Sequence, residues 1–264
     1  MKGIIYYYSG SGNTKLACQY IVKKIKNIEI DIFNIVKDGI PNLEKYNLVG
    51  FATFADFFGP PYLVQTFIEN LPQQKDKLAF VFNTYGGMSG KTLKIFDKWV
   101  TAKGFKIIAY HSLHTPENYP PMIAKGRSNK QAPSKKEMNE FNNFISDLDR
   151  LLILLKKGKE IPKKKIKIGL LDSLIPTFSR TKARKDMGEK YVDEQLCTEC
   201  GKCEKICPYE AIKLSPSPTF NMNKCYGCWA CYNHCPDKAI YTKKYRGIGH
   251  YPEPHKQLKE KLKV

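Results

Sequence analysis

The sequence has few acidic residues, no long apolar run and only two tryptophans. No stretch approaches the ~18 apolar residues that a membrane-spanning helix needs. Residues 1–6 lack the apolar run and cleavage site of a secretory signal. We therefore expect a soluble, cytoplasmic protein. No Gly-x-Ser-x-Gly, Cys–His or paired-carboxylate pattern stands out.

Basic residues outnumber acidic ones, with 44 Lys and Arg against 25 Asp and Glu in 264 residues, a net charge of +19. The excess is densest in residues 156–190, where a lysine run around Pro162 precedes a short amphipathic segment. We place a domain boundary in this segment and interpret it as a solvated basic linker. Contact with an anionic membrane surface or with nucleic acid is the alternative, and we do not expect a nucleic-acid partner.

The first 155 residues alternate between strand-like and helix-like patterns. Helical spacing of apolar residues separates short buried-strand candidates, and this alternation implies right-handed βαβ crossovers. The predicted fold class is therefore α/β, a doubly wound five-stranded parallel sheet of order 2-1-3-4-5 that is covered on both faces. We expect strands at residues 2–8, 28–33, 48–54, 78–83 and 105–111, and helices at residues 13–26, 62–70, 91–103 and 135–155.

Eight of the nine cysteines lie between Cys197 and Cys235, whereas Cys18 stands alone. The eight form two copies of C-x2-C-x2-C-x3-C-P, 28 residues apart, and each copy continues to an Ala-Ile pair. Two copies of one unit should pack about a pseudo-two-fold axis. Three thiolates at this spacing can wrap a loop around one face of a cubane cluster. Soft thiolates select iron–sulfur clusters or zinc, and zinc is the alternative; a zinc ribbon, however, needs only two C-x2-C pairs.

This cysteine run resembles that of the bacterial ferredoxins with two clusters, in which the fourth cysteine of each copy ligates the other cluster. The resemblance implies a small α+β domain at residues 191–244, with residues 245–264 as a basic C-terminal tail. It implies two [4Fe-4S] clusters. Carried over residue by residue, the ligands of cluster I are Cys197, Cys200, Cys203 and Cys235, and those of cluster II are Cys225, Cys228, Cys231 and Cys207.

The first predicted strand is followed by a Ser-Gly-Ser-Gly turn that opens a helix. Hydroxyls and free N–H groups at a helix N-terminus form an anion site. The alternative is that Ser11 or Asn13 merely caps the helix. The turn resembles the FMN-phosphate loop of flavodoxins. The resemblance implies that the FMN phosphate is bound by Ser9, Gly10, Ser11, Gly12, Asn13 and Thr14.

Two later loops follow the third and fourth predicted strands, at the end of the sheet where ligands of such folds bind. We expect them to contact the isoalloxazine ring, although their aromatic residues could instead simply close the core. Asn118 and Tyr119, after the fifth strand, are a weaker prediction. The expected ring contacts are Thr53, Phe54, Ala55, Asp56, Phe57, Thr84, Tyr85, Gly86 and Gly87.

Over residues 1–155 and 191–244 the chain resembles the flavodoxin–ferredoxin fusion proteins of anaerobic bacteria and archaea. The resemblance implies an electron-transfer protein that passes electrons between two [4Fe-4S] clusters and FMN and serves a partner redox enzyme. A reductase that uses reduced FMN on a bound small molecule or a partner's cofactor is the alternative. One departure is the basic charge, because free flavodoxins and ferredoxins are typically acidic.

Overall fold

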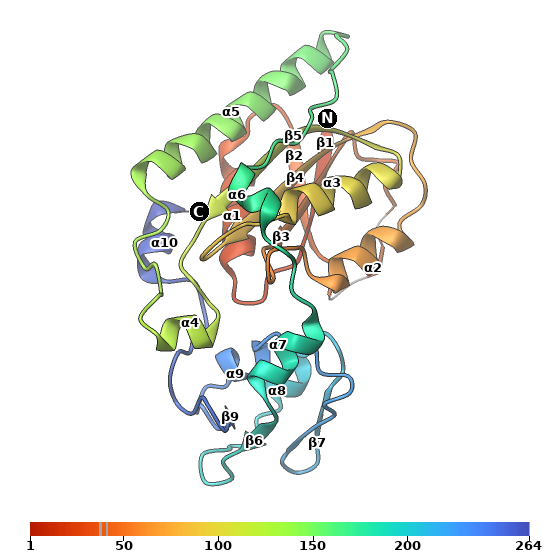
Figure 1. Cartoon of the computed structure of the whole chain (residues 1–264). Coiled ribbons are helices and arrows are strands. Elements are labelled where there is room, and N and C mark those ends of the chain that lie inside the picture. The colour runs from red at the N-terminus through yellow and green to blue at the C-terminus, as the bar shows by residue number, and fades with distance from the viewer. Residues whose placement is uncertain (37–38, 41, 264) are drawn as a thin grey trace.

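The structure, a computed structural model, describes residues 1–36, 39–40 and 42–263. Figure 1 shows two parts: a sheet with helices on both faces and, beyond one end of the strands, a smaller part built from short elements. All five strands of the sheet are parallel, in the order β2-β1-β3-β4-β5, which confirms the predicted order. The strands are β1 (Lys2–Tyr7), β2 (Glu29–Asn34), β3 (Leu48–Phe54), β4 (Lys77–Tyr85) and β5 (Phe105–His114).

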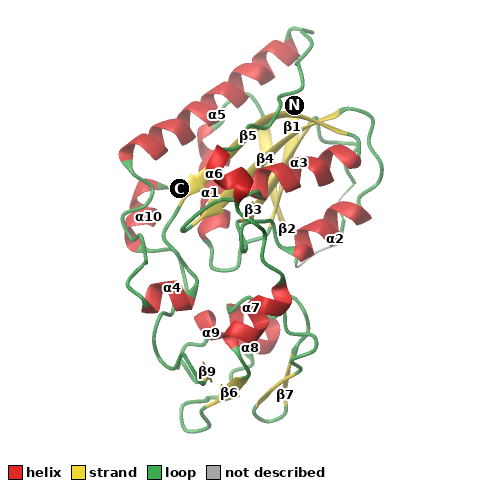
Figure 2. Ribbon diagram, viewed as in Figure 1, coloured by secondary structure: helices red, strands yellow, loops and turns green. Residues whose placement is uncertain are grey.

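Helices cover both faces of this sheet, as expected for parallel strands that are buried on both sides (Figure 2). Ile5, Phe80 and Phe82 pack with α1 and α5 on one face. On the other face, Ile4 and Phe51 pack with α2 and α3. These helices are α1 (Asn13–Lys24), α2 (Tyr62–Asn70), α3 (Thr92–Ala102) and α5 (Lys135–Lys156). We call this part the sheet domain.

His111, on β5, lies within an aromatic stack on one face of the sheet. Its ring is 5.4 Å from that of Phe141 and 5.3 Å from that of Phe144. Its Nε2 atom is buried without a hydrogen-bond partner. Burial lowers the pKa of His111 to about 4 from its usual 6.5.

This buried histidine predicts a pH dependence of stability. Between pH 6.5 and 4 the unfolded chain binds a proton at His111 that the folded chain does not, so the free energy of unfolding falls on acidification. When the pH is lowered from 7 to 5, the unsubstituted protein should lose about 2 kcal/mol more of its free energy of unfolding than His111→Phe, which has no group at this position to protonate. Denaturant unfolding of both proteins at the two pH values measures this difference. An unchanged difference would contradict the prediction.

The chain between the two parts runs back along the edge strand of the sheet. The backbone N–H of Lys164 donates to the carbonyl of Ile107 over 2.8 Å, and Ile166 and Ile168 pack on the core. The seven lysines of the basic run are all exposed; they are Lys156, Lys157, Lys159, Lys163, Lys164, Lys165 and Lys167. Two short helices follow, α6 (Leu170–Leu174) and α7 (Arg180–Met187), and an earlier one, α4 (Pro120–Ala124), lies after β5.

The smaller part, which we call the cysteine domain, repeats itself at an interval of 28 residues. β6 pairs with β9 and β7 with β8, both antiparallel, so each two-stranded sheet takes one strand from each copy. Even the left-handed backbone positions recur, for example at Gly201 and Trp229. The repeat confirms the predicted pseudo-two-fold relation. Its elements are β6 (Lys190–Val192), α8 (Lys202–Lys205), β7 (Ile212–Leu214), β8 (Pro218–Phe220), α9 (Ala230–His234) and β9 (Ile240–Thr242).

The last residues, predicted as a basic tail, return to the sheet domain. Helix α10 (Lys256–Lys261) lies near α1 in Figure 1. Leu258 and Leu262 are 0% exposed and belong to the same apolar cluster as α1 and α5. This segment therefore contributes to the core of the sheet domain. In the described part of the chain, no helix is both long and apolar enough to cross a bilayer.

Candidate cofactor sites

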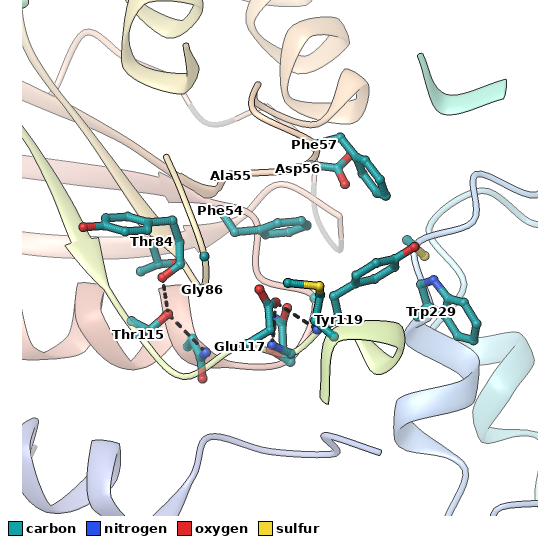
Figure 3. Close-up of a pocket in the computed structure, with 18 of the residues that line it drawn as sticks. Phe54, Ala55, Asp56, Phe57, Thr84, Gly86, Thr115, Glu117, Tyr119 and Trp229 are labelled. Carbon is teal, nitrogen blue, oxygen red and sulfur yellow. Dashed lines mark hydrogen bonds between the residues drawn. The ribbon is translucent and has the colours of Figure 1, made fainter. Parts of the chain in front are cut away.

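A cavity of about 360 Å³ lies between the sheet domain and the cysteine domain (Figure 3). Loops that follow β1, β3, β4 and β5 form its walls on the sheet side, which is the end of a doubly wound sheet where ligands bind. The cysteine domain closes the opposite side with the segment 226–229. The two domains thus share one cavity.

The Ser-Gly turn lies in the wall of this cavity, with Ser9, Gly10 and Ser11 among the lining residues. Gly12 is the N-cap of α1, and the Ser9 hydroxyl accepts hydrogen bonds from the backbone N–H groups of Gly12 over 3.1 Å and of Lys15 over 3.3 Å. The alternative in which Ser11 or Asn13 caps the helix is therefore not what the structure shows. The backbone N–H groups of Asn13 and Thr14, the first two residues of α1, have no partner within the helix, and both residues line the cavity. Such donors suit an anion.

The polar side chains of the turn hold it to its neighbours. Asn13 donates from Nδ2 to the carbonyl of Pro116 over 3.1 Å and accepts from the Tyr251 hydroxyl over 2.9 Å. The hydroxyls of Thr14 and Thr84 are 2.9 Å apart. Asn13 and Thr14 therefore orient the loop through these contacts, and they also line the cavity.

Gly12 lies behind the turn rather than in the cavity wall. Its φ of 95° is in the left-handed region, and a Cβ placed there would lie 2.8 Å from the Pro254 ring. Pro254 belongs to the C-terminal segment that precedes α10. A glycine is therefore required here both by the backbone angle and by the close approach of this segment.

The two loops predicted to contact a flavin ring line the cavity almost completely. Thr53 is the exception, because it is fully buried and does not line the cavity. His114, which stacks on Tyr85 at 5.1 Å, orients the second loop by donating to the carbonyl of Gly86 over 2.8 Å. The residues from these loops that line the cavity include Phe54, Ala55, Asp56, Phe57, Thr84, Tyr85, Gly86 and Gly87.

The loop after β5 contributes more than its weak sequence signal indicated. Glu117 accepts backbone hydrogen bonds from Asn118 and Tyr119 over 2.9 and 3.0 Å. Burial raises the pKa of Glu117 above its usual value. The ring of Tyr119 is 5.4 Å from that of Phe57, and both line the cavity (Figure 3). Only Asn118 and Tyr119 of this loop were predicted.

Trp229 forms part of the cavity wall on the side of the cysteine domain. It is 2% exposed, and its indole Nε1 is buried without a hydrogen-bond partner. Its ring contacts that of Tyr119 across the boundary between the domains, at 6.1 Å. Trp229 therefore contributes the surface of its ring to the cavity wall, whereas its Nε1 atom is buried within the protein.

The eight clustered cysteines lie in two groups of four, and each group lines its own small cavity. The groups are the two ligand sets that the resemblance implies: Cys197, Cys200, Cys203 and Cys235 in one cavity, and Cys207, Cys225, Cys228 and Cys231 in the other. Cys18 lies apart, buried in the sheet domain, where desolvation raises its pKa. The described residues include no group of three or more His, Cys, Asp or Glu that could hold one metal ion.

Backbone hydrogen bonds to sulfur repeat with the same symmetry. Ala211 donates to the Cys207 Sγ over 3.4 Å, and Ala239 donates to the Cys235 Sγ over 3.2 Å. Hydrogen bonds to cluster-ligating sulfurs stabilise added negative charge and tune the reduction potential. The thiolate environments thus fit iron–sulfur clusters.

The three cavities are arranged in series. Cys228 and Tyr226 line both the cavity of cluster II and the large cavity. Cysteines of the two ligand sets, among them Cys203 and Cys231, pack in one apolar cluster. Cys200, a predicted ligand of cluster I, is exposed. The order along the molecule is therefore the cavity of cluster I, the cavity of cluster II and the large cavity.

Arg180, on α7, joins the two domains at the edge of the large cavity. Its guanidinium pairs with Asp56 at 3.0 Å and donates to the carbonyl of Tyr226 over 2.7 Å. The Tyr226 hydroxyl in turn donates to Asp56 over 2.9 Å. Burial raises the pKa of Asp56, and Arg180 opposes that rise. Asp56 therefore lines the cavity, but its carboxylate is directed to the contact between the domains.

We expect Arg180→Ala to lower the free energy of unfolding by about 3 kcal/mol, because it leaves the Asp56 carboxylate buried without its cation. Arg150→Ala is the matched control, since it removes an arginine from an exposed pair with Asp147, and we expect it to cost less than ~1 kcal/mol. Urea unfolding of both variants measures the two effects. Equal costs for the two variants would contradict the role of Arg180.

Comparison with known proteins identifies the cysteine domain. Residues 196–240 match the family model of the 4Fe-4S dicluster domain. Over 52 residues the chain is 44% identical to a protein of the ion-translocating oxidoreductase complex of Methanosarcina acetivorans, a match that covers 19% of this chain and 20% of that protein. It is 35% identical over 51 residues to a ferredoxin of Pyrobaculum islandicum, which covers 19% of this chain and 48% of the ferredoxin. The chain thus spans about half or less of these relatives.

Among solved structures, a flavodoxin from the domain Archaea is similar to 58% of this chain and 99% of its own length, with 17% identity and a TM-score of 0.44. The family match confirms the predicted ferredoxin-type domain with its [4Fe-4S] clusters. The observed strand order confirms the flavodoxin-like sheet. The chain therefore combines a flavodoxin-like sheet with a two-cluster electron-transfer domain.

Proposed function

We propose that this protein transfers electrons between two [4Fe-4S] clusters and an FMN molecule bound in the large cavity. The observation that carries this proposal is that Cys228 lines both the cavity of cluster II and the large cavity. FMN exchanges one or two electrons, whereas each cluster transfers one. The flavin and the clusters together would therefore convert between one-electron and two-electron transfer.

The residues of the cavity suit each part of FMN. The turn at Ser9–Thr14 offers hydroxyls for a phosphate, together with the N–H groups of Asn13 and Thr14 at the start of α1. Phe54, Phe57 and Tyr119 offer aromatic surface for the ring system. Trp229 adds aromatic surface from the cysteine domain. An anion site and an aromatic wall together favour this cofactor over a purely apolar ligand.

The same arrangement supports a role in serving a partner enzyme. Cys200 is exposed, so cluster I lies where an external redox protein could exchange electrons. Relatives of the cysteine domain include subunits of multi-subunit oxidoreductases, such as the delta subunit of an NADH-dependent phenylglyoxylate dehydrogenase from Aromatoleum evansii. We infer that a redox enzyme is the partner, in the reducing cytoplasm where free thiols persist.

The alternative, a reductase that acts on a bound small molecule, needs room for a substrate beside the flavin. Ligand pockets range over roughly 300–1,000 Å³. The cavity, at about 360 Å³, lies near the lower end of that range. This volume favours an electron carrier, in which the cavity holds the cofactor alone.

Anaerobic purification followed by iron, sulfide and flavin analysis tests the proposal. We expect about eight irons, eight sulfides and one FMN per chain. Anaerobic reduction followed by stopped-flow absorbance should then show the clusters and the flavin reduced in one connected sequence. Zinc without flavin would contradict the proposal, and saturable turnover of an added small molecule would favour the reductase.

A further inference from the structure

The two halves of the cysteine domain differ at one pair of equivalent positions. Lys190 lies seven residues before Cys197, and Pro218 lies seven residues before Cys225. They begin the equivalent strands β6 and β8. Because each of these strands reaches over to the other half, Lys190 lines the cavity of cluster II and Pro218 lines the cavity of cluster I. The pseudo-symmetry thus places a cation beside one cluster and an apolar ring beside the other.

The ammonium group of Lys190 is buried against the ligands of cluster II. The residue is 8% exposed, and its Nζ donates to the Cys225 Sγ over 3.1 Å. In the part of the chain that the structure describes, no carboxylate forms an ion pair with it. A buried lysine without a counter-charge is unfavourable. The thiolates around cluster II are therefore the negative charge that balances Lys190.

Charge at this position acts on the reduction of the cluster. Each electron added to a cluster adds one negative charge, and a nearby cation stabilises the reduced state. The effect is large where water is excluded, as it is around Cys225, Cys231 and Trp229, which are all buried. Exclusion of water alone would disfavour the added negative charge and so lower the reduction potential. The positive charge of Lys190 opposes this effect at cluster II. Cluster I has the exposed Cys200 and, at the equivalent position, a proline instead of a cation.

We propose that Lys190 raises the reduction potential of cluster II above that of cluster I and so directs electrons from cluster I through cluster II toward the large cavity. This inference rests on the proposed function, because it requires both clusters. In the step concerned, one electron leaves cluster I, which is oxidised, and enters cluster II, which is reduced. No proton or bond changes place.

Lys190→Met in the full-length holoprotein tests the proposal, because methionine keeps most of the side-chain length and removes the charge. Potentiometric titration followed by electron paramagnetic resonance reports each cluster separately. We expect one midpoint potential to fall by at least about 59 mV, which corresponds to a tenfold change in the equilibrium constant of a one-electron reduction. The other midpoint should stay where it is.

Two matched variants separate charge from packing. Lys190→Arg keeps the charge and should keep the higher midpoint. Lys224→Met removes an exposed lysine next to Cys225, and its midpoints should match those of the unsubstituted protein, because water screens that charge. Lys190→Gln gives a second neutral side chain should the methionine variant fail to fold.

Iron analysis of each protein separates the possible failures. If the unsubstituted protein holds no clusters, the proposed function itself is wrong. If it holds eight irons and Lys190→Met or Lys190→Gln leaves both midpoints unchanged, or moves both equally, the inference about Lys190 is overturned while the proposed function stands.

Discussion

Replacing Cys225 and Cys228 together with alanine is expected to halve the iron content, from about eight atoms per chain to about four, and to disconnect the flavin from cluster I. These two cysteines belong to the set that lines the inner cluster cavity, and Cys228 also lines the large cavity. Removing two of four thiolates leaves cluster II too few ligands. Electron exchange between the bound flavin and cluster I should then be slower than in the unsubstituted protein. Stopped-flow absorbance measures this rate.

The internal repeat supplies a matched comparison for this experiment. Cys197→Ala with Cys200→Ala is the same change 28 residues earlier, and it should also leave about four irons. Because cluster II then remains next to the large cavity, the flavin should still exchange electrons with it. Cys18→Ala should leave about eight irons, since Cys18 lies in the core of the sheet domain. Similar flavin kinetics in both double variants would contradict the serial order of the sites.

The sheet domain was predictable because its strands are buried on both faces and therefore appear as short, nearly continuous apolar runs. The run in β3 is a case in point, and the predicted range 48–54 agrees with Leu48–Phe54. The cysteine domain was predictable for another reason. Its spacing is set by cluster geometry rather than by packing, so the repeat is explicit in the sequence.

The contacts between the domains were not predictable, because they depend on residues far apart in the chain. Arg180 meets Asp56 from 124 positions away, and nothing local marks either residue as part of an ion pair. Lys190 begins an ordinary short strand, and its place beside Cys225 follows only from the pairing of β6 with β9. The C-terminal segment is predicted as a tail from its basic charge, whereas Leu258 and Leu262 lie in the core of the sheet domain.

One substitution distinguishes the two interpretations of the Ser-Gly turn, namely that it binds the FMN phosphate or that it only begins helix α1. Ser11 is buried in the cavity wall beside the N-terminus of α1, and Asn118 donates to its hydroxyl. Aspartate is favourable near a helix N-terminus, so Ser11→Asp should not lower the stability of the flavin-free protein if the turn serves only the helix. If the turn binds a phosphate, the same carboxylate repels it.

The repulsion between two unit charges about 4 Å apart near a protein surface is on the order of 4 kcal/mol. We therefore expect Ser11→Asp to weaken FMN binding by at least about a hundredfold, as measured by fluorescence titration of the flavin-free protein. The matched control is Ser134→Asp, the same change at the N-cap of α5, which lies outside the cavity and should bind FMN as before. Lys15→Gln should also bind normally, because Lys15 is exposed and the proposed phosphate site consists of backbone N–H groups and hydroxyls. Unweakened binding in Ser11→Asp would mean that the turn only begins the helix, and the flavin would then have to be sought elsewhere in the cavity.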